Sequence, residues 1–300
     1  MRPDPTQFDR RVLIGAGLAV ALSGGPAQAA ARRINTAAQF RAIESRVGGR
    51  LGVAALDTGS NRWLAHRSEE RFAMCSTFKW LAAAAVLARV DHGAERLDRR
   101  VAYAKADLLG NSPITGARLA EGSMSLGDLC AAAVTRSDNA AANLILKELG
   151  GPAGLTRWLR EAGDSVTRLD RDEPSLNTAA PGDPRDTTTP SASIADLRQF
   201  LVGKALSDSS RLQLTRWMIA CTTGDRRLRA GLPNGWRVGD KTGTGDHATA
   251  NDVAIVSPPG RAPILIAAYL SGGKAPDAAR DAALAEVARI VVAGLGYARG

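Results

Sequence analysis

The last third of the chain contains a run of apolar segments and turns, WRVGDKTGTGDHATANDVAIVSPPGRAPILIAAY, at residues 236–269. Its apolar segments at 236–241, 253–256 and 264–269 are short, and glycine and proline turns separate them. Short apolar segments bounded in this way predict three β-strands rather than helices. The C-terminal part of the fold is therefore expected to be a sheet.

The N-terminal part carries the same kinds of element. A helix is predicted at 36–47, two short strands at 51–56 and 63–65, and a closing helix at 277–293. Because both chain ends supply strands and a helix, we predict an α+β fold of the α/β sandwich type. One antiparallel sheet formed from both chain ends and flanked by helices is expected beside an inserted all-helical lobe.

The middle of the chain is predominantly helical. Residues 77–90 are apolar on nearly every side, which predicts a buried helix. An irregular stretch at 169–190 is rich in proline, aspartate and threonine, and a loop of this length inside a compact domain is usually functional or disordered. Further helices are predicted at 126–133, 140–149, 153–162, 194–201 and 210–220.

Composition limits the classes of function. Of the 300 residues, 45% are hydrophobic, which favours a globular protein with a full core. The net charge is +9, but no basic stripe with interleaved aromatic residues occurs, so we expect no nucleic-acid partner. Cys75, Cys130 and Cys221 form no CxxC or Cys/His cluster, and we predict neither a metal site nor a cofactor.

Residues 1–29 have the pattern of an export signal. A pair of arginines at 10–11 precedes a short apolar run at 12–22, and AQA at 27–29 fits a cleavage site. The run is too short to anchor the mature protein in a membrane. The paired arginines favour twin-arginine export, and an ordinary Sec signal is the alternative. Both routes predict a periplasmic or secreted protein after cleavage near Ala29.

Ser76 opens the buried helix, and Lys79 follows it three residues later. Residues at this spacing share a helix face, so the amine of Lys79 can take the hydroxyl proton of Ser76. The spacing alone is weak, because Ser271 and Lys274 repeat it in a glycine-containing loop that cannot fix the pair. A helix cap is the alternative interpretation of Ser76.

Two further motifs carry polar groups suited to acyl transfer. In Ser-Asp-Asn at 137–139, Ser137 can relay a proton to a leaving nitrogen and Asn139 can hold a substrate carbonyl, unless the motif only caps a helix. In the long loop, Glu173 stands four residues before Asn177. A carboxylate held by an amide can position a water molecule, and a solvated acid in a turn is the alternative.

The motif Lys241-Thr242-Gly243-Thr244 ends a predicted strand. Gly243 allows another backbone to approach closely, Lys241 supplies fixed positive charge, and the threonine hydroxyls can bind a carboxylate. The chain has only six lysines against 33 arginines, and two of the six are Lys79 and Lys241. The use of lysine rather than arginine at both places indicates that an amine, and not just any cation, is required there.

Ser-x-x-Lys, Ser-Asp-Asn, Glu-x-x-x-Asn and Lys-Thr-Gly occur here in that order. Together they closely resemble the class A serine β-lactamases, from about Thr36 to the C-terminus. The resemblance implies hydrolysis of small-molecule β-lactams through a serine acyl-enzyme, antibiotic resistance, and a monomer. It also implies a sheet-plus-helix lobe at 30–67 and 221–300, and a helical lobe at 68–220 with an omega-like loop at 168–186. The active site is then expected between the two lobes.

Catalytic roles follow from the same resemblance. Ser76 is implied to be the acylated nucleophile, Lys79 its general base or proton shuttle, and Ser137 the group that passes a proton to the lactam nitrogen. Glu173 is implied to activate the deacylating water. Whether Lys79 or Glu173 is the base in acylation stays open, because the identity of this base is disputed for the family.

Substrate-binding roles are implied as well. Asn139 is expected to hold the substrate's side-chain amide, and the backbone N–H groups of Ser76 and Thr244 to form the oxyanion hole. Asn177 is expected to assist Glu173. The residues expected around the substrate carboxylate are Lys241, Thr242, Gly243 and Thr244.

Some positions depart from the family pattern. No arginine follows Lys-Thr-Gly on the next strand, and we assign its carboxylate-binding role to Arg227, shortly after Thr-Thr-Gly. Asn111 replaces the aromatic residue that usually guards the site entrance. The partner positions of Cys130 and Cys75 in family disulfides are Ala83 and Gly245, so free thiols are predicted.

The resemblance also implies two features of the omega-like loop. An ion pair between Arg171 and Asp186 is expected to close its neck, and the Glu173–Pro174 bond is a candidate cis peptide.

Two other functions share part of the motif set: a D-alanyl-D-alanine peptidase and a β-lactam sensor that stays acylated. Glu173 with Asn177 favours the hydrolase over the peptidase, because a carboxylate placed to activate water clears an acyl-enzyme. Burst kinetics would distinguish the sensor.

Overall fold

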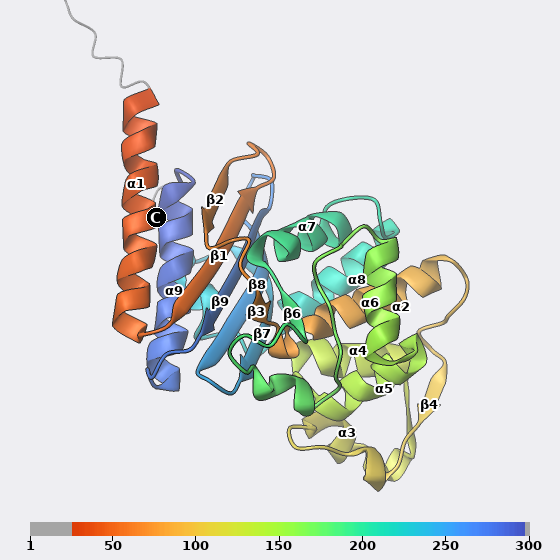
Figure 1. Cartoon of the computed structure of the whole chain (residues 1–300). Helices are drawn as coiled ribbons and strands as arrows, with labels where there is room; N and C mark the ends of the chain where they lie inside the picture. The colour runs from red at the N-terminus through yellow and green to blue at the C-terminus, as the bar shows by residue number, and fades with distance from the viewer. Residues whose placement is uncertain (1–25, 298–300) are drawn as a thin grey trace, which may run out of the picture.

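The computed structural model describes residues 26–297, with side chains from residue 36 onward. The predicted export signal therefore lies almost entirely outside the described residues. A five-stranded antiparallel sheet is at the centre of the protein, in the order β2-β1-β9-β8-β7 (Figure 1). Its strands are β1 (Arg50–Asp57), β2 (Trp63–His66), β7 (Arg237–Gly245), β8 (Thr249–Ser257) and β9 (Ile264–Ser271).

The prediction that both chain ends share one sheet is confirmed by the pairing of β1 with β9. Their register places Arg50 opposite Ser271 and Asp57 opposite Ile264. Side chains alternate between the two faces, as in any strand. Leu51, Val53 and Ala55 belong to one core cluster, and Ala54 and Leu56 to the other.

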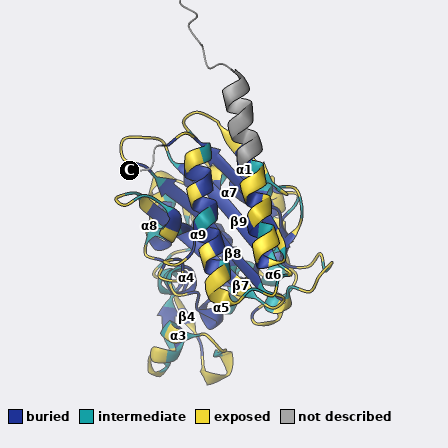
Figure 2. Ribbon diagram, turned by 90° about the vertical axis from the view of Figure 1, so that its left-hand side faces the viewer, coloured by how far each residue is buried: buried dark blue, intermediate teal, exposed yellow. Residues whose placement is uncertain are grey.

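Two helices cover one face of the sheet, α1 (Pro26–Val47) and α9 (Asp277–Gly294). They lie side by side, and their outward sides are exposed while the strands behind them are buried (Figure 2). Phe40 and Ile43 of α1 and Leu284 of α9 pack with the strands into the first core. The apolar periodicity of both helices therefore matches the face that they bury.

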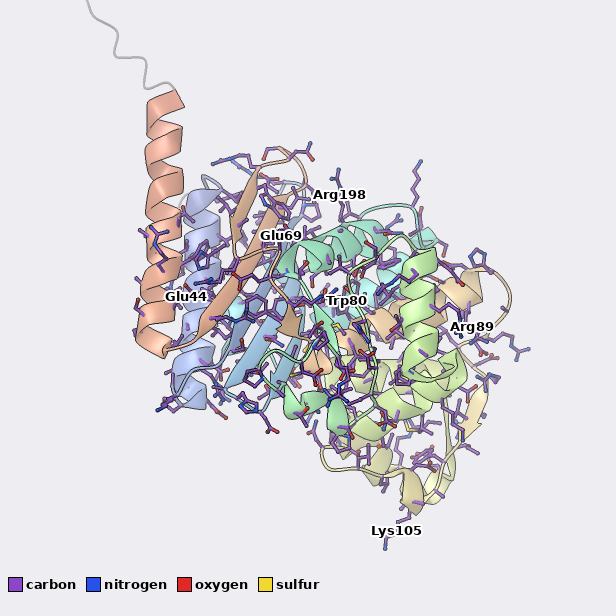
Figure 3. All side chains as sticks on the ribbon, viewed as in Figure 1. Glu44, Glu69, Trp80, Arg89, Lys105 and Arg198 are labelled. Atoms are coloured by element: carbon purple, nitrogen blue, oxygen red, sulfur yellow. The ribbon has the colours of Figure 1, made fainter. Side chains whose placement is uncertain are left out.

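Helices of the middle segment cover the other face. At their centre is α2 (Phe78–Asp91), whose residues 78–88 are all buried, as its uniformly apolar sequence predicts. Trp80 lies inside this layer and packs edge-on against Phe200, with ring centroids 6.2 Å apart (Figure 3). The other long helices here are α4 (Leu126–Thr135), α5 (Asn139–Leu149), α6 (Gly151–Glu161), α7 (Pro190–Leu201) and α8 (Asp208–Ile219).

The helical layer also contains short elements that the sequence did not predict. Two-residue strands β3 (Phe72–Ala73) and β6 (Thr187–Thr188) pair with each other, and β4 (Arg100–Ala102) pairs with β5 (Ser123–Ser125). A five-residue helix, α3 (Pro113–Ala117), lies nearby. Elements this short have no sequence periodicity of their own, and long-range pairing fixes them.

Several predicted boundaries were wrong although the element types were right. Helix α1 begins at Pro26 rather than residue 36, and β7 continues past Lys241 to Gly245. The loop at 169–190 contains a 3₁₀ turn at Ser175–Thr178 and ends where α7 begins. The polar Thr-Gly-Thr-Gly end of β7 is held in the sheet by pairing with β8, which propensity alone does not anticipate.

Among the helices that the structure describes, none has the length and hydropathy needed to cross a bilayer.

Candidate active site

Ser76 lies in a 3₁₀ turn, Cys75–Thr77, that leads directly into α2. Cys75 has a φ of 47°, in the left-handed region that residues with a β-carbon rarely adopt. The Ser76 hydroxyl donates a hydrogen bond to Glu173 Oε1 at 3.2 Å. The hydroxyl therefore faces a carboxylate, and the helix-cap interpretation of Ser76 is wrong.

Lys79 is fully buried one turn into α2 and makes contacts on three sides. Its Nζ lies 2.9 Å from Glu173 Oε1 and donates to the Ser137 carbonyl at 2.8 Å and to Asn139 Oδ1 at 2.6 Å. Burial lowers the pKa of Lys79, and the Glu173 carboxylate opposes that shift. Ser76 and Lys79 therefore meet through one oxygen of Glu173.

Ser137 and its neighbours connect the helical layer to the sheet. Lys241 Nζ donates to Ser137 Oγ at 3.0 Å, and Asn111 Nδ2 donates to the Ser137 carbonyl at 3.0 Å. Asp138 does cap a helix, because its side chain accepts from the N–H of Ala141 at the start of α5. The capping interpretation is thus right for Asp138, while the Ser137 hydroxyl points to a lysine.

Glu173 is held from both sides. Asn177 Nδ2 donates to its Oε2 at 2.5 Å, and Asn143 on α5 bonds both the N–H and the carbonyl of Glu173, at 2.9 and 2.8 Å. The Glu173–Pro174 peptide is cis, as predicted. The predicted ion pair at the neck of the loop is also present, with Arg171 Nε 2.6 Å from Asp186 Oδ2.

The end of β7 provides the opposite wall of the site. Lys241 is fully buried, and burial together with the nearby Lys79 ammonium lowers its pKa to about 8. Thr242 Oγ1 is hydrogen-bonded to Thr223 Oγ1 at 2.6 Å. A β-carbon on Gly243 would lie 2.5 Å from the Met74 carbonyl oxygen, so the predicted close backbone approach at this glycine is confirmed.

Arg227 is buried behind this strand. Its guanidinium donates to Thr244 Oγ1 and to the carbonyls of Gly243 and Asn251, each at 2.8 Å. Its Nε lies 2.8 Å from Asp281 Oδ1 on α9. The structure thus brings Arg227 to the Lys-Thr-Gly segment, where the sequence assigned it.

Comparison with known proteins places this geometry in a family. The model of the β-lactamase enzyme family matches residues 35–295. A solved structure of an ancestral class A β-lactamase (GNCA) superposes with a TM-score of 0.85 at 60% identity, covering 86% of this chain and 99% of that one. The chain belongs to the class A serine β-lactamases. As a β-lactamase it is a hydrolase that opens the β-lactam amide through a serine acyl-enzyme, an activity that confers antibiotic resistance.

Two curated relatives illustrate the likeness of this β-lactamase. It is 51% identical over 259 residues to β-lactamase AST-1 of Nocardia asteroides, covering 86% of this chain and 83% of that protein. It is 47% identical over 288 residues to the carbapenem-hydrolyzing β-lactamase KPC of Klebsiella oxytoca, covering 96% and 97%. The predicted family and α+β fold are both confirmed.

The three cysteines of the β-lactamase are free and buried, as predicted. Burial raises the pKa of the Cys75 thiol to about 12, and the Glu173 carboxylate adds to that shift. A β-carbon on Gly245 would lie 2.6 Å from Cys75 Sγ. The glycine therefore leaves room for the thiol at the position that the family resemblance pairs with Cys75.

Sequence reasoning missed Asn143, Asn251 and Asp281. Asn143 stands four residues after Asn139 on α5, and that helical spacing was the one available indication that both face the site. Asn251 and Asp281 act on residues that are distant in sequence, through contacts that no local spacing indicates.

Proposed function

We propose that Ser76 is the residue that β-lactams acylate, and that Glu173 clears the acyl-enzyme. The position of Glu173 carries this proposal. Its Oε1 lies 3.2 Å from the Ser76 hydroxyl and 2.9 Å from the Lys79 ammonium, while Asn177 holds its Oε2. One fixed carboxylate is thus within reach of the protons that both half-reactions must move.

In acylation, Ser76 Oγ bonds to the lactam carbonyl carbon, the C–N bond breaks, and the nitrogen receives a proton through Ser137. The hydroxyl proton of Ser76 goes to Glu173 or Lys79, and the hydrogen bond from Ser76 favours Glu173. In deacylation, Glu173 takes a proton from water, whose oxygen attacks the ester carbon. Ser76 Oγ then leaves and regains a proton.

The substrate's carboxylate is proposed to bind at the end of β7, next to Lys241 and the hydroxyls of Thr242 and Thr244. Arg227 supports that position by holding Thr244 Oγ1. Asn139 is proposed to hold the side-chain amide of the substrate with one N–H of its Nδ2, since its Oδ1 accepts from Lys79 and the other N–H donates to the Gly110 carbonyl at 2.9 Å. The N–H groups of Ser76 and Thr244 are proposed to stabilise the oxyanion.

Replacing the nucleophile tests the assignment. Ser76→Ala is expected to lower kcat for a chromogenic cephalosporin by at least about 10³-fold, because no other hydroxyl takes over. Ser271→Ala is the matched control, since Ser271 repeats the Ser-x-x-Lys spacing at the end of β9, and it should retain full activity. A Ser76→Ala enzyme with near wild-type turnover would exclude Ser76 as the nucleophile.

The protein is further proposed to be exported and to act as a monomer in the periplasm or outside the cell. Cleavage after Ala29 would remove the first four residues of α1, Pro26 to Ala29, and leave the part that packs in the core. N-terminal sequencing of the mature protein and sedimentation at micromolar concentration test both points. An intact N-terminus on exported protein, or a stable dimer, would contradict them.

A further inference from the structure

Asn251 lies on β8 at the face of the sheet that points to the helical layer. Its side chain is buried, and Nδ2 donates two hydrogen bonds, to the Ala73 carbonyl at 2.8 Å and to the Met74 carbonyl at 3.0 Å. Its Oδ1 is buried and has no hydrogen-bond partner among the described residues. The side chain is thus oriented by its two donated bonds, and its acceptor is left unused.

The two carbonyls belong to the residues that lead into Ser76. Cys75, between Met74 and Ser76, has its φ at 47°, a conformation that persists only where surrounding contacts impose it. Met74 is held on its other side, because its N–H donates to the Asp186 carbonyl at 2.8 Å. Asn251 therefore supplies two hydrogen bonds from the sheet to the residues that lead into this bent turn.

The main chain of Asn251 reaches the other half of the site. Its carbonyl accepts from Arg227 NH1 at 2.8 Å, and the same nitrogen donates to the carbonyl of Gly243. Gly243 in turn lies directly against the Met74 carbonyl. One residue thus contacts both the segment before the proposed nucleophile and the arginine behind the proposed carboxylate site.

We propose that Asn251 is a positioning residue for acylation, which fixes Ser76 relative to the Lys-Thr-Gly strand through the Ala73 and Met74 carbonyls. The proposal rests on the role proposed above for Ser76. The proposal predicts different effects on acylation and deacylation. The pair that we propose activates water, Glu173 and Asn177, is held by Asn143 and by the omega-like loop, and not by Asn251. Loss of the two bonds should slow attack by Ser76 far more than deacylation, because the groups that hold the attacking water stay in place.

Asn251→Leu and Asn251→Ala are the test variants, the first filling the space and the second leaving room for water. Stopped-flow measurements with a chromogenic cephalosporin give the acylation and deacylation rate constants separately. We expect the acylation constant to fall roughly 10- to 100-fold in both variants, as displacement of a reacting group by about 1 Å does. Deacylation should stay within about 2-fold of wild type, so that acylation limits turnover.

Ile255→Ala is the matched control, because Ile255 lies four residues further along β8 on the same face and packs in the same core. It should lower the Tm at least as much as the Asn251 variants and leave the acylation constant unchanged. Wild-type acylation in either folded Asn251 variant, or equal losses in both rate constants, would overturn the positioning role. Absence of a Ser76 adduct in wild-type enzyme by peptide mapping would instead overturn the proposed role of Ser76.

Discussion

At the scale of single residues, the site depends on buried charges that lie close together. Lys79 and Lys241 are both fully buried, and each is paired with polar groups that a substrate or a proton transfer would use. Burial lowers the pKa of both amines, so each can lose its proton at a lower pH than an exposed lysine. An arginine in the same place would stay charged. This accounts for lysine at these two places in an arginine-rich chain.

The pKa of Lys241 sets an expectation for the pH profile. Because that pKa is about 8, the ammonium loses its proton above this pH and no longer attracts the substrate carboxylate that we propose binds beside it. We expect kcat/KM to decline above about pH 8 for substrates that carry the carboxylate. A β-lactam esterified at that carboxylate should lack this decline, and equal profiles for the two substrates would contradict the assignment.

Arg227 gives a second expectation at this scale. Arg227→Ala removes the donor that holds Thr244 Oγ1, so KM should rise about 10-fold with little change in kcat, as loss of ground-state binding does. Arg226→Ala is the control, since Arg226 contacts the same carboxylate of Asp281 at 3.2 Å but its side chain is 85% exposed. Equal KM values for the two variants would show that the substrate carboxylate is held elsewhere.

At the scale of elements, two buried carboxyl groups lie close together where α7 packs against the turn that follows α6. Asp196 on α7 is 2% exposed, and Asp164 lies just before the loop. Each has an Oδ2 without a hydrogen-bond partner among the described residues. Burial raises the pKa of Asp196 well above 3.8, the neighbouring Asp164 adds to the shift, and Arg160 opposes it. The buried Asp196 carboxyl group therefore tends to keep its proton in the folded protein.

This pair predicts a pH dependence of stability. Above about pH 3.8 the unfolded chain releases the Asp196 proton while the folded protein keeps it, so the free energy of unfolding falls as pH rises toward the folded-state pKa. Asp196→Asn removes this titration and should reduce the fall by up to about 1.4 kcal/mol per pH unit. Urea unfolding between pH 4 and 7 measures it, and an unchanged slope in the variant would show that Asp196 does not keep its proton in the folded protein.

At the scale of the whole molecule, the sheet built from both chain ends explains why distant motifs meet. The turn bearing Ser76 packs against β7, and the end of β7 carries Lys241 and Thr244. Strands 236–241 and 264–269 and the buried helix at 77–90 could be predicted from sequence, because continuous apolar runs indicate elements that are buried on all sides. The four motifs likewise supplied most of the residues that the structure brings together around Ser76.

Other parts of the molecule were not predictable. The left-handed turn at Cys75 and the two-residue strands β3 and β6 depend on contacts between segments far apart in sequence. Asn251 contacts residues more than 170 positions away, so no spacing could indicate it. Local patterns report local conformation and burial, whereas these features follow only from tertiary packing.

The central claim is that Ser76 is acylated and that Glu173 releases it. Its most direct test is mass spectrometry of Glu173→Ala after exposure to a penicillin, followed by peptide mapping. Loss of the carboxylate should slow deacylation by about 10²- to 10⁴-fold, whereas Lys79 remains to take the Ser76 proton in acylation. An adduct with the mass of the intact drug should therefore accumulate on the peptide containing Ser76. An unmodified protein, or an adduct on any other residue, would contradict the account.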